Sequence, residues 1–267
     1  QGNVSRFAQL VVGDVRDAYT TTKCARGADV VFHLAAHTSV PGSMNEPRLA
    51  VEGNLSGTLS ALEAARANGA RLVFASSSSV YGEGGGRSRE DDHTEPMSPY
   101  ALSKLLGEEL LAGWWKLFAV ESASLRLFNV YGPRCSATGT EGLVIPRFLA
   151  ALRVEGPPAV IYGDGSQGRD FVHVEDVARA FLAAAVADLP PGARINVGSG
   201  VSTSILGVLN AVAEGLGVEP FAERAPPRPG DPQDTLAAID LAAGALGWTP
   251  TIAFREGVAD LCRRTDD

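Results

Sequence analysis

Three short apolar runs, separated by stretches with helical spacing, dominate the first half of the chain. The runs are Leu10–Val12, Val30–Leu34 and Leu72–Ala75. Unbroken apolar character is typical of strands in a parallel sheet, because helices cover both faces of such a sheet. We predict that these runs form buried parallel strands, and that Ser124–Phe128 forms another.

Two longer segments have the apolar spacing of helices. The first covers Leu49–Asn68 and ends at Gly69, which is a helix-end signal. The second covers Pro99–Trp114, where Ser98 is the expected N-cap and Pro99 the first helical residue. The resulting alternation of strands and helices predicts an α/β fold with a doubly wound parallel sheet.

The texture of the chain changes after Tyr131, where glycine and proline cluster and the helical stretches become shorter. We predict one domain over residues 1–131 and a smaller, loop-rich lobe over residues 132–267, with some segments returning to the sheet. Ligands of open α/β sheets bind at the carboxyl ends of the strands, which this lobe is expected to cover.

A glycine-rich phosphate loop between a first strand and a first helix is missing. Gly84–Gly86 is no substitute, since it follows a strand without opening a helix. We therefore expect that an N-terminal βαβ unit of a Rossmann-like sheet is absent from this sequence.

Composition narrows the classes of function. A net charge of -8 argues against binding to nucleic acid through general basicity, although a few arginines can still hold an anionic small molecule. Cys24, Cys135 and Cys262 show no metal-binding spacing and fit a reduced, cytoplasmic compartment. No apolar run is long enough for a membrane span, and the first residues have no signal core.

Tyr100 and Lys104 carry the most informative chemistry. Residues four apart share one face of a helix, so the ammonium group can lie beside the phenol. A free tyrosine has a pKa near 10, and a neighbouring cation lowers it by favouring the phenolate. Such a tyrosine can exchange a proton with a sugar hydroxyl, although the same spacing also occurs by chance on exposed helix turns.

A serine run follows the strand at Leu72–Ala75. Ser76 and Ser77 stand where ligands of α/β sheets bind, and one of these hydroxyls could bond the reacting oxygen. The alternative is a polar turn that only caps the strand.

Three spaced motifs resemble the NAD-dependent epimerase/dehydratase family of extended short-chain dehydrogenases/reductases. They are Ser76–Gly82, Ser98–Lys104 and Arg126–Pro133. The resemblance runs from about Val11 to Trp248. It implies a dinucleotide-binding role for residues 1–131, NAD as cofactor and a UDP-linked nucleotide sugar as substrate. Within the family, the chain is most similar to the 4-epimerases of UDP-glucose and UDP-N-acetylhexosamines.

The resemblance places the catalytic trio on Ser77, Tyr100 and Lys104. Sugar dehydratases of the family have an Asp-Glu pair where this chain has Ser78 and Ser79. Water elimination is therefore disfavoured, and transient oxidation at C4 with hydride return to the opposite face remains.

The implied ligand contacts fall into two sets. Residues matching the family's NAD contacts are Asp14, Val15, Leu34, Ala35, Ala36, Asn54, Ser76, Tyr100, Lys104 and Phe128. Residues matching its substrate contacts are Ser77, Asn129, Val144, Tyr162, Arg169, Arg228, Asp231 and Thr235. A threonine at position 235 would leave room for an N-acetyl group on the sugar.

Plainer interpretations stay open for several of these residues. Asp14 could belong to a turn that caps a helix, His33 could be a packed structural histidine, and Asn54 could simply lie on a helix face. Arg169 and Arg228 could be surface ion-pair residues. Reductase, decarboxylase and non-catalytic dinucleotide-binding functions are alternatives to epimerisation. A homodimer through the helices at Leu49–Asn68 and Pro99–Trp114 is also expected, with Trp114 and Trp115 either at that surface or packed within one subunit.

Overall fold

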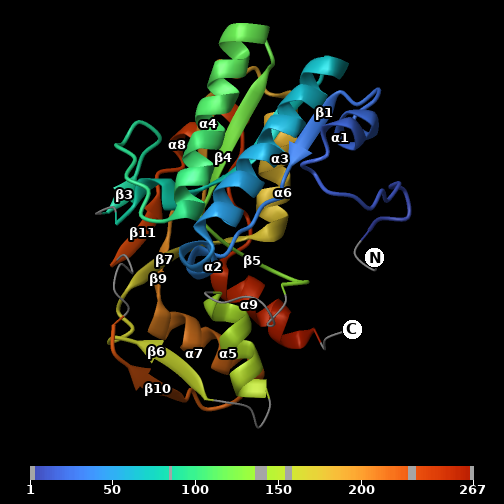
Figure 1. Cartoon of the computed structure of the whole chain (residues 1–267). Coiled ribbons are helices and arrows are strands. Elements are labelled where there is room, and N and C mark those ends of the chain that lie inside the picture. The colour runs from blue at the N-terminus through green and yellow to red at the C-terminus, as the bar shows by residue number, and fades with distance from the viewer. Residues whose placement is uncertain (1–3, 84–85, 136–142, 154–157, 228–232, 265–267) are drawn as a thin grey trace. The chain divides into compact units, whose positions relative to one another are not determined.

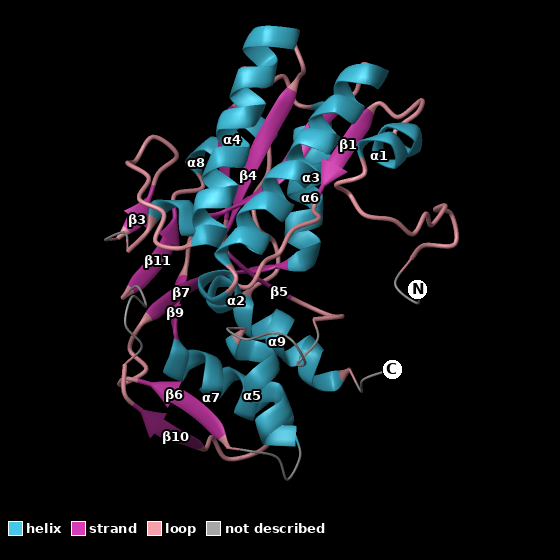
Figure 2. Ribbon diagram, in the orientation of Figure 1, coloured by secondary structure: helices cyan, strands magenta, loops and turns pink. Residues whose placement is uncertain are grey.

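A computed structural model describes residues 4–83, 86–135, 143–153, 158–227 and 233–264 (Figure 1). Helices and strands alternate along the chain, which gives an α/β fold (Figure 2). The chain divides into two compact units. The first unit comprises residues 1–76, 98–125 and 188–194, and the second comprises residues 77–97, 126–187 and 195–267.

A four-stranded sheet contains the strands predicted near residues 30, 72 and 124. Its order is β1 (Val30–His33), β2 (Arg71–Ser77), β4 (Ser122–Leu127) and β8 (Ala193–Val197). β1 and β2 are parallel, with Val30 opposite Arg71 and His33 opposite Phe74. All three segments form strands as predicted, but β1 is less buried than expected, since Phe32 is exposed. β8 joins the sheet from a much later part of the chain.

The strand predicted at Leu10–Val12 is wrong. These residues are irregular, and their side chains are 47%, 50% and 83% exposed. An apolar segment becomes a strand only where a neighbour pairs with its backbone N–H and C=O groups. No strand among the described residues pairs with this segment, so its apolar pattern has no partner.

Four helices belong to the first unit: α1 (Ala18–Cys24), α2 (Val40–Asn45), α3 (Pro47–Asn68) and α4 (Pro99–Phe118). α3 ends at Gly69, whose φ of 64° is left-handed, as its end signal predicts. At the start of α4 the Ser98 Oγ accepts a hydrogen bond from the Ala101 N–H at 3.1 Å, which confirms the predicted N-cap.

The core of the first unit forms where α3 and α4 meet β2. It contains Ala61, Leu62, Ala65, Leu72, Phe74 and Leu111. A Cβ atom at Gly107 would lie 2.8 Å from the Phe74 ring, so glycine is what allows α4 to approach the sheet this closely. The Trp114 indole donates to the Glu63 carboxylate at 2.8 Å, which places Trp114 in packing between α3 and α4.

The second unit contains shorter strands and five helices among the described residues. One group of strands has the order β3 (Arg87–Ser88), β11 (Asp234–Ala237), β7 (Gly168–His173) and β5 (Asn129–Tyr131), with β9 (Ser202–Ser204) antiparallel to β7. A separate parallel pair joins β6 (Ala159–Tyr162) to β10 (Ala222–Ala225). The helices are α5 (Val144–Arg153), α6 (Val174–Val186), α7 (Ile205–Leu216), α8 (Asp240–Leu246) and α9 (Phe254–Arg263).

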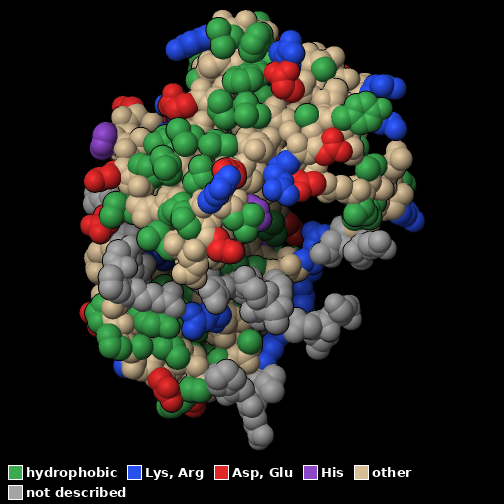
Figure 3. Space-filling view, viewed as in Figure 1, with side chains coloured by type: hydrophobic (Ala, Val, Ile, Leu, Met, Phe, Trp, Pro, Cys, Tyr) green, Lys and Arg blue, Asp and Glu red, His purple; other side chains and the backbone are tan. Residues whose placement is uncertain are grey.

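Basic and acidic side chains are interspersed over the face of the molecule shown in Figure 3. No helix in the described part of the chain is both long and apolar enough to cross a membrane.

Candidate active site

Tyr100 and Lys104 lie on one face at the start of α4. The Lys104 Nζ lies 5.8 Å from the centroid of the Tyr100 ring and 4.9 Å from that of Phe74. It also donates a hydrogen bond to the Ala75 carbonyl at 2.8 Å. The proximity of lysine and tyrosine that their spacing predicts is therefore present, inside the first unit.

The ammonium of Lys104 is almost completely withdrawn from water. Its side chain is only 3% exposed, and burial lowers the pKa of Lys104 to about 8. The group is therefore still mainly charged at neutral pH. A cation this close to a phenol favours the phenolate, which is the form that accepts a proton.

Ser76 and Ser77 have different partners. The Ser76 hydroxyl is buried and donates to the Glu108 carboxylate at 2.5 Å. The half-buried Ser77 hydroxyl caps η1 (Ser78–Tyr81), where its oxygen accepts from the Ser79 N–H at 3.2 Å and from the Ser79 hydroxyl at 2.9 Å. Both serines stand at the carboxyl end of β2, as the sequence predicts.

Leu34 and two alanines follow the carboxyl end of β1. Leu34 and Ala35 are exposed and Ala36 is half-buried, so this turn leaves its backbone open to a ligand. The Asn54 side chain from α3 holds His37, the residue after Ala36, because the Asn54 amide oxygen accepts a hydrogen bond from the His37 N–H at 2.7 Å. Asn54 also donates to the Ser103 hydroxyl at 2.8 Å. It therefore links three segments of the first unit, and its contact with a cofactor stays a prediction.

His33 is a packed histidine with a side-chain partner. It is 4% exposed, and its Nε2 lies 3.1 Å from the Thr58 hydroxyl. Burial, with a smaller contribution from the charge of Lys104, lowers the pKa of His33 to about 4. The imidazole is therefore neutral at physiological pH and helps to hold β1 against α3.

Asp14 forms an ion pair with Arg16. Two contacts of 3.0 Å and one of 2.5 Å join the carboxylate to the guanidinium, and these hydrogen bonds lower the pKa of Asp14 to about 2. The nearby carboxylate that caps a helix is Asp17, at the start of α1. Val15 is half-buried and lies so close to Gly57 of α3 that a Cβ there would be 2.9 Å from it.

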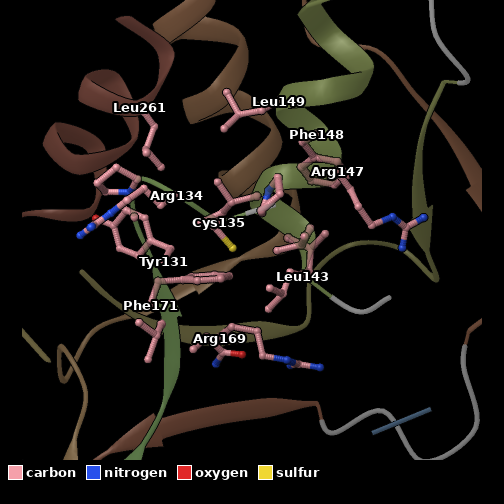
Figure 4. Close-up of a pocket in the computed structure, with 18 of the residues that line it drawn as sticks. Tyr131, Arg134, Cys135, Leu143, Arg147, Phe148, Leu149, Arg169, Phe171 and Leu261 are labelled. Atoms are coloured by element: carbon pink, nitrogen blue, oxygen red, sulfur yellow. The ribbon is translucent and has the colours of Figure 1, made fainter. Parts of the chain in front are cut away.

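A pocket of about 510 Å³ lies within the second unit, and four residues of the predicted substrate set line it. They are Asn129, Val144, Tyr162 and Arg169, and Figure 4 shows Arg169 reaching along one side of this pocket. Thr235 adjoins them, since its hydroxyl lies 3.4 Å from the Asn129 amide nitrogen and it pairs with Arg169 in the sheet. The structure thus brings five predicted residues together.

The other residues of the two sets lie elsewhere. Phe128 is buried with its ring 6.4 Å from that of Tyr81, and it does not line the pocket. Arg228 and Asp231 lie outside the described residues.

Further arginines around the pocket are absent from the predicted set. The lining contains Arg134, Arg147, Arg153, Arg263 and Arg264 besides Arg169, and no aspartate or glutamate among the described residues. In Figure 4, Arg134, Arg147 and Arg169 come from three different segments around the cavity. In the sequence, the adjacent Arg263 and Arg264 are the only hint of this cluster. They lie more than 90 residues from Arg169, so the sequence alone does not indicate that they line the same pocket.

These arginines differ in their hydrogen-bond and ion-pair partners within the protein. The Arg153 guanidinium donates to the carbonyls of Leu261, Cys262 and Arg264 at 2.9, 3.1 and 2.7 Å, so it ties α5 to the end of α9. Arg264 and Arg263 pair with Asp260 at 2.8 and 3.5 Å. For Arg147, the described part of the chain offers no ion pair. The pocket is therefore positively charged, and an anionic ligand fits it.

Metal binding finds no support in the described residues, which contain no cluster of three or more histidine, cysteine or acidic side chains able to hold an ion.

Comparison with known proteins identifies the family. The model of the NAD dependent epimerase/dehydratase family matches residues 1–198. The UDP-glucose 4-epimerase of Mycolicibacterium smegmatis is 38% identical over 261 residues, which cover 96% of this chain and 82% of that protein.

Two solved structures are similar over most of the chain. The UDP-glucose 4-epimerase of Thermus thermophilus in complex with NAD has a TM-score of 0.89 and 36% identity, covering 98% of this chain and 87% of that one. The UDP-N-acetylglucosamine 4-epimerase of Methanobrevibacter ruminantium in complex with UDP-N-acetylmuramic acid has a TM-score of 0.89 and 33% identity, covering 95% and 81%. The chain therefore belongs to the NAD dependent epimerase/dehydratase family, as an enzyme of that family whose cofactor is NAD.

Proposed function

We propose that this protein is a 4-epimerase of UDP-linked hexoses that oxidises and re-reduces C4 of the bound sugar. The observation that carries the proposal is the Tyr100–Lys104 pair, in which a buried ammonium lies 5.8 Å from the centre of a phenol ring. This arrangement supports proton exchange with a sugar hydroxyl, because a neighbouring cation favours the phenolate form of a tyrosine.

The pocket of the second unit supports a nucleotide sugar as the substrate. Its arginines suit the two phosphates, and an acidic residue that would repel them is absent from the described lining. Tyr131, Phe148 and Phe171 add apolar surface suited to a flat base. We assign the diphosphate to Asn129, Arg169 and Arg228, the base to Val144 and Tyr162, and a ribose hydroxyl to Asp231. UDP is the nucleotide because the similar epimerases act on UDP sugars.

The first unit has features that fit NAD. The turn at Leu34–Ala36 carries small or exposed side chains at the end of a parallel strand, where backbone can approach a dinucleotide. We assign Asp14, Val15, Asn54 and Ser76 of this unit to the cofactor as well, together with Phe128, which belongs to the second unit. The Ser76 hydroxyl already donates to Glu108, so its contact with NAD would use the backbone. NAD supplies the hydride acceptor and donor of the reaction.

Three residues of this chain have separate roles in the proton transfer. Tyr100 takes the proton from the C4 hydroxyl and later returns it. Lys104 maintains the charge that favours the phenolate, and Ser77 hydrogen-bonds the reacting oxygen. Ser78 and Ser79 offer no acid or base for water elimination, which favours epimerisation over dehydration.

Replacing the phenol tests the assignment. Tyr100→Phe keeps the ring and removes the proton acceptor, so kcat should fall at least about 100-fold with an unchanged circular dichroism spectrum. Conversion of UDP-glucose to UDP-galactose, followed by NMR, gives the rate. Tyr19→Phe is the control, because Tyr19 is 77% exposed on α1. Turnover of Tyr100→Phe at the wild-type rate would contradict the proposal.

The same assay distinguishes the alternatives and the sugar. Net consumption of NADH would indicate a reductase, and release of CO2 from a uronic acid substrate would indicate a decarboxylase. The half-buried Thr235 leaves space beside the sugar, so we expect UDP-N-acetylglucosamine to be epimerised too. No activity on that substrate would reject the N-acetyl part of the proposal alone.

A further inference from the structure

A third residue continues the catalytic face of α4. Tyr100, Lys104 and Glu108 follow one another at intervals of four residues, which places them on one side of the helix. Glu108 is 1% exposed, yet the proposed mechanism gives this buried carboxylate no task. A buried charge is stable only where other groups compensate it, so its partners are informative.

The Ser76 hydroxyl and the Arg194 guanidinium both contact the Glu108 carboxylate. The Ser76 hydroxyl donates to its Oε1 at 2.5 Å. The Arg194 Nε of β8 lies 3.0 Å from its Oε2, without the alignment of a hydrogen bond. Arg194 also bonds the neighbouring Glu109 at 2.5 Å, whose side chain is 59% exposed. Glu109 therefore shares the arginine of Glu108, whereas the Ser76 hydroxyl bonds Glu108.

Two residues of α4, one turn apart, thus hold two successive residues of β2. Lys104 bonds the Ala75 carbonyl at 2.8 Å, and Glu108 bonds the Ser76 side chain. Ser77 is the next residue of the strand, so fixing Ser76 against α4 also fixes the backbone that carries the Ser77 side chain.

We propose that Glu108 is a positioning residue that sets the direction of the Ser77 hydroxyl through its hydrogen bond with Ser76, with Arg194 compensating its charge. This inference rests on the proposed function of Ser77. Since a misplacement of about 1 Å can reduce a rate about 100-fold, the contact acts on the chemical step. The residues assigned to the diphosphate, Asn129 and Arg169 among them, take no part in the Ser76–Glu108 contact, so substrate affinity should not change.

Steady-state kinetics of four variants test the proposal. Glu108→Ala and Ser76→Ala should lower kcat about 10- to 100-fold while KM for UDP-glucose stays within about twofold of wild type. Combining the two changes should add little, because each removes the same contact. Glu108→Gln keeps an oxygen acceptor for Ser76 and should recover part of kcat.

Glu109→Gln is the matched control, since it weakens the pairing of Arg194 without touching Ser76. Its kcat should stay within about twofold of wild type. A kcat of Glu108→Ala equal to wild type, an equal fall in Glu109→Gln, or a loss expressed only in KM would overturn the proposal. If Glu108→Ala does not fold, Ser76→Ala can be compared with wild type instead, because it breaks the same hydrogen bond by removing a single oxygen atom.

A crystallographic measurement separates this inference from the proposed function. Wild-type protein without turnover would reject the function, whereas the positioning role is also visible in the crystal structure of Ser76→Ala. We expect the Ser77 hydroxyl to turn away from the Ser79 N–H in that variant. A Ser77 side chain in its original place would overturn the positioning role whether or not the protein is active.

Discussion

The two units use positive charge in opposite ways. The first unit buries one lysine, Lys104, against two aromatic rings and a backbone carbonyl. The second unit arranges several arginines around a pocket, where carbonyls and Asp260 hold some of them. Burial moves the pKa of Lys104 to about 8, whereas guanidinium groups stay charged at every physiological pH.

This difference matches two different demands. A group that tunes a proton transfer must respond to its surroundings, and a lysine withdrawn from water does so. Groups that hold phosphates must provide a fixed charge and several donors, which suits arginine. Lys104 of the first unit should therefore control kcat and the pocket arginines of the second unit KM, and the following changes test that division.

The largest effect is expected at Lys104. Lys104→Met keeps an unbranched side chain one atom shorter than lysine but removes the charge beside Tyr100, so kcat should fall about 100- to 1,000-fold. The same change should raise the free energy of unfolding at pH 7 by about 1–3 kcal/mol, because an ammonium with a lowered pKa is buried at a cost. Enzyme assays and urea denaturation measure the two effects.

The stability gain in Lys104→Met should shrink above pH 8. There the folded wild type releases the proton of Lys104 while the unfolded chain keeps it up to about pH 10.4, so wild-type stability rises across this interval. A Lys104→Met protein that is less stable than wild type at pH 7 would show that the carbonyl contact outweighs the burial of the charge.

A smaller effect, on KM and not on kcat, is expected at Arg169. Arg169→Ala should raise KM for UDP-glucose about 10- to 100-fold and leave kcat within about threefold, since a hydrogen bond to a charged group contributes about 1.5–3 kcal/mol. Arg48→Ala is the control, because the Arg48 side chain is 85% exposed on α3. A loss in kcat with KM unchanged would break the division between the units.

The last prediction concerns the stability of the fold at acid pH, to which His33 contributes, and not catalysis. The folded protein keeps His33 neutral down to about pH 4, whereas an unfolded histidine binds a proton near pH 6.5. The unfolded chain therefore holds the extra proton between these values. Unfolding free energy should fall as pH drops from about 6.5 to 4, by up to about 3 kcal/mol from this residue.

Urea denaturation of His33→Gln, in which the amide can still bond Thr58, should show a flatter pH dependence than wild type. His93 is exposed, so His93→Gln should keep the wild-type slope. An unchanged slope in His33→Gln would mean that burial of this imidazole does not depress its protonation.

Local signals in the sequence predicted the elements that carry the first unit's chemistry. Ser98 and Pro99 set the start of α4, and Gly69 sets the end of α3, because caps depend on neighbouring residues alone. The four-residue spacing of Tyr100 and Lys104 predicted their proximity for the same reason. Family motifs, and not local physics, indicated Asn129, Val144, Tyr162 and Arg169 of the pocket.

Contacts between distant segments could not be predicted in this way. Leu10–Val12 has the pattern of a strand, but strand formation depends on a neighbour that the pattern does not contain. The bond between Ser76 and Glu108 joins residues 32 positions apart, and Arg153 reaches carbonyls more than 100 positions away. Such contacts arise from tertiary packing, and the hydrophobic periodicity of the sequence does not predict them.

The carboxylate of Asp170, the residue after Arg169, constrains how the pocket can be redesigned. It is buried, and it accepts from the N–H groups of Ser199, Gly200 and Ala237 at 2.6, 2.9 and 3.0 Å. The bond to Ala237 fixes the register of β11, the strand that bears Thr235, at a point two residues from Thr235. Directed evolution toward new sugars should therefore succeed by exchanging side chains at position 235, while insertions or deletions in β11 abolish expression of folded protein.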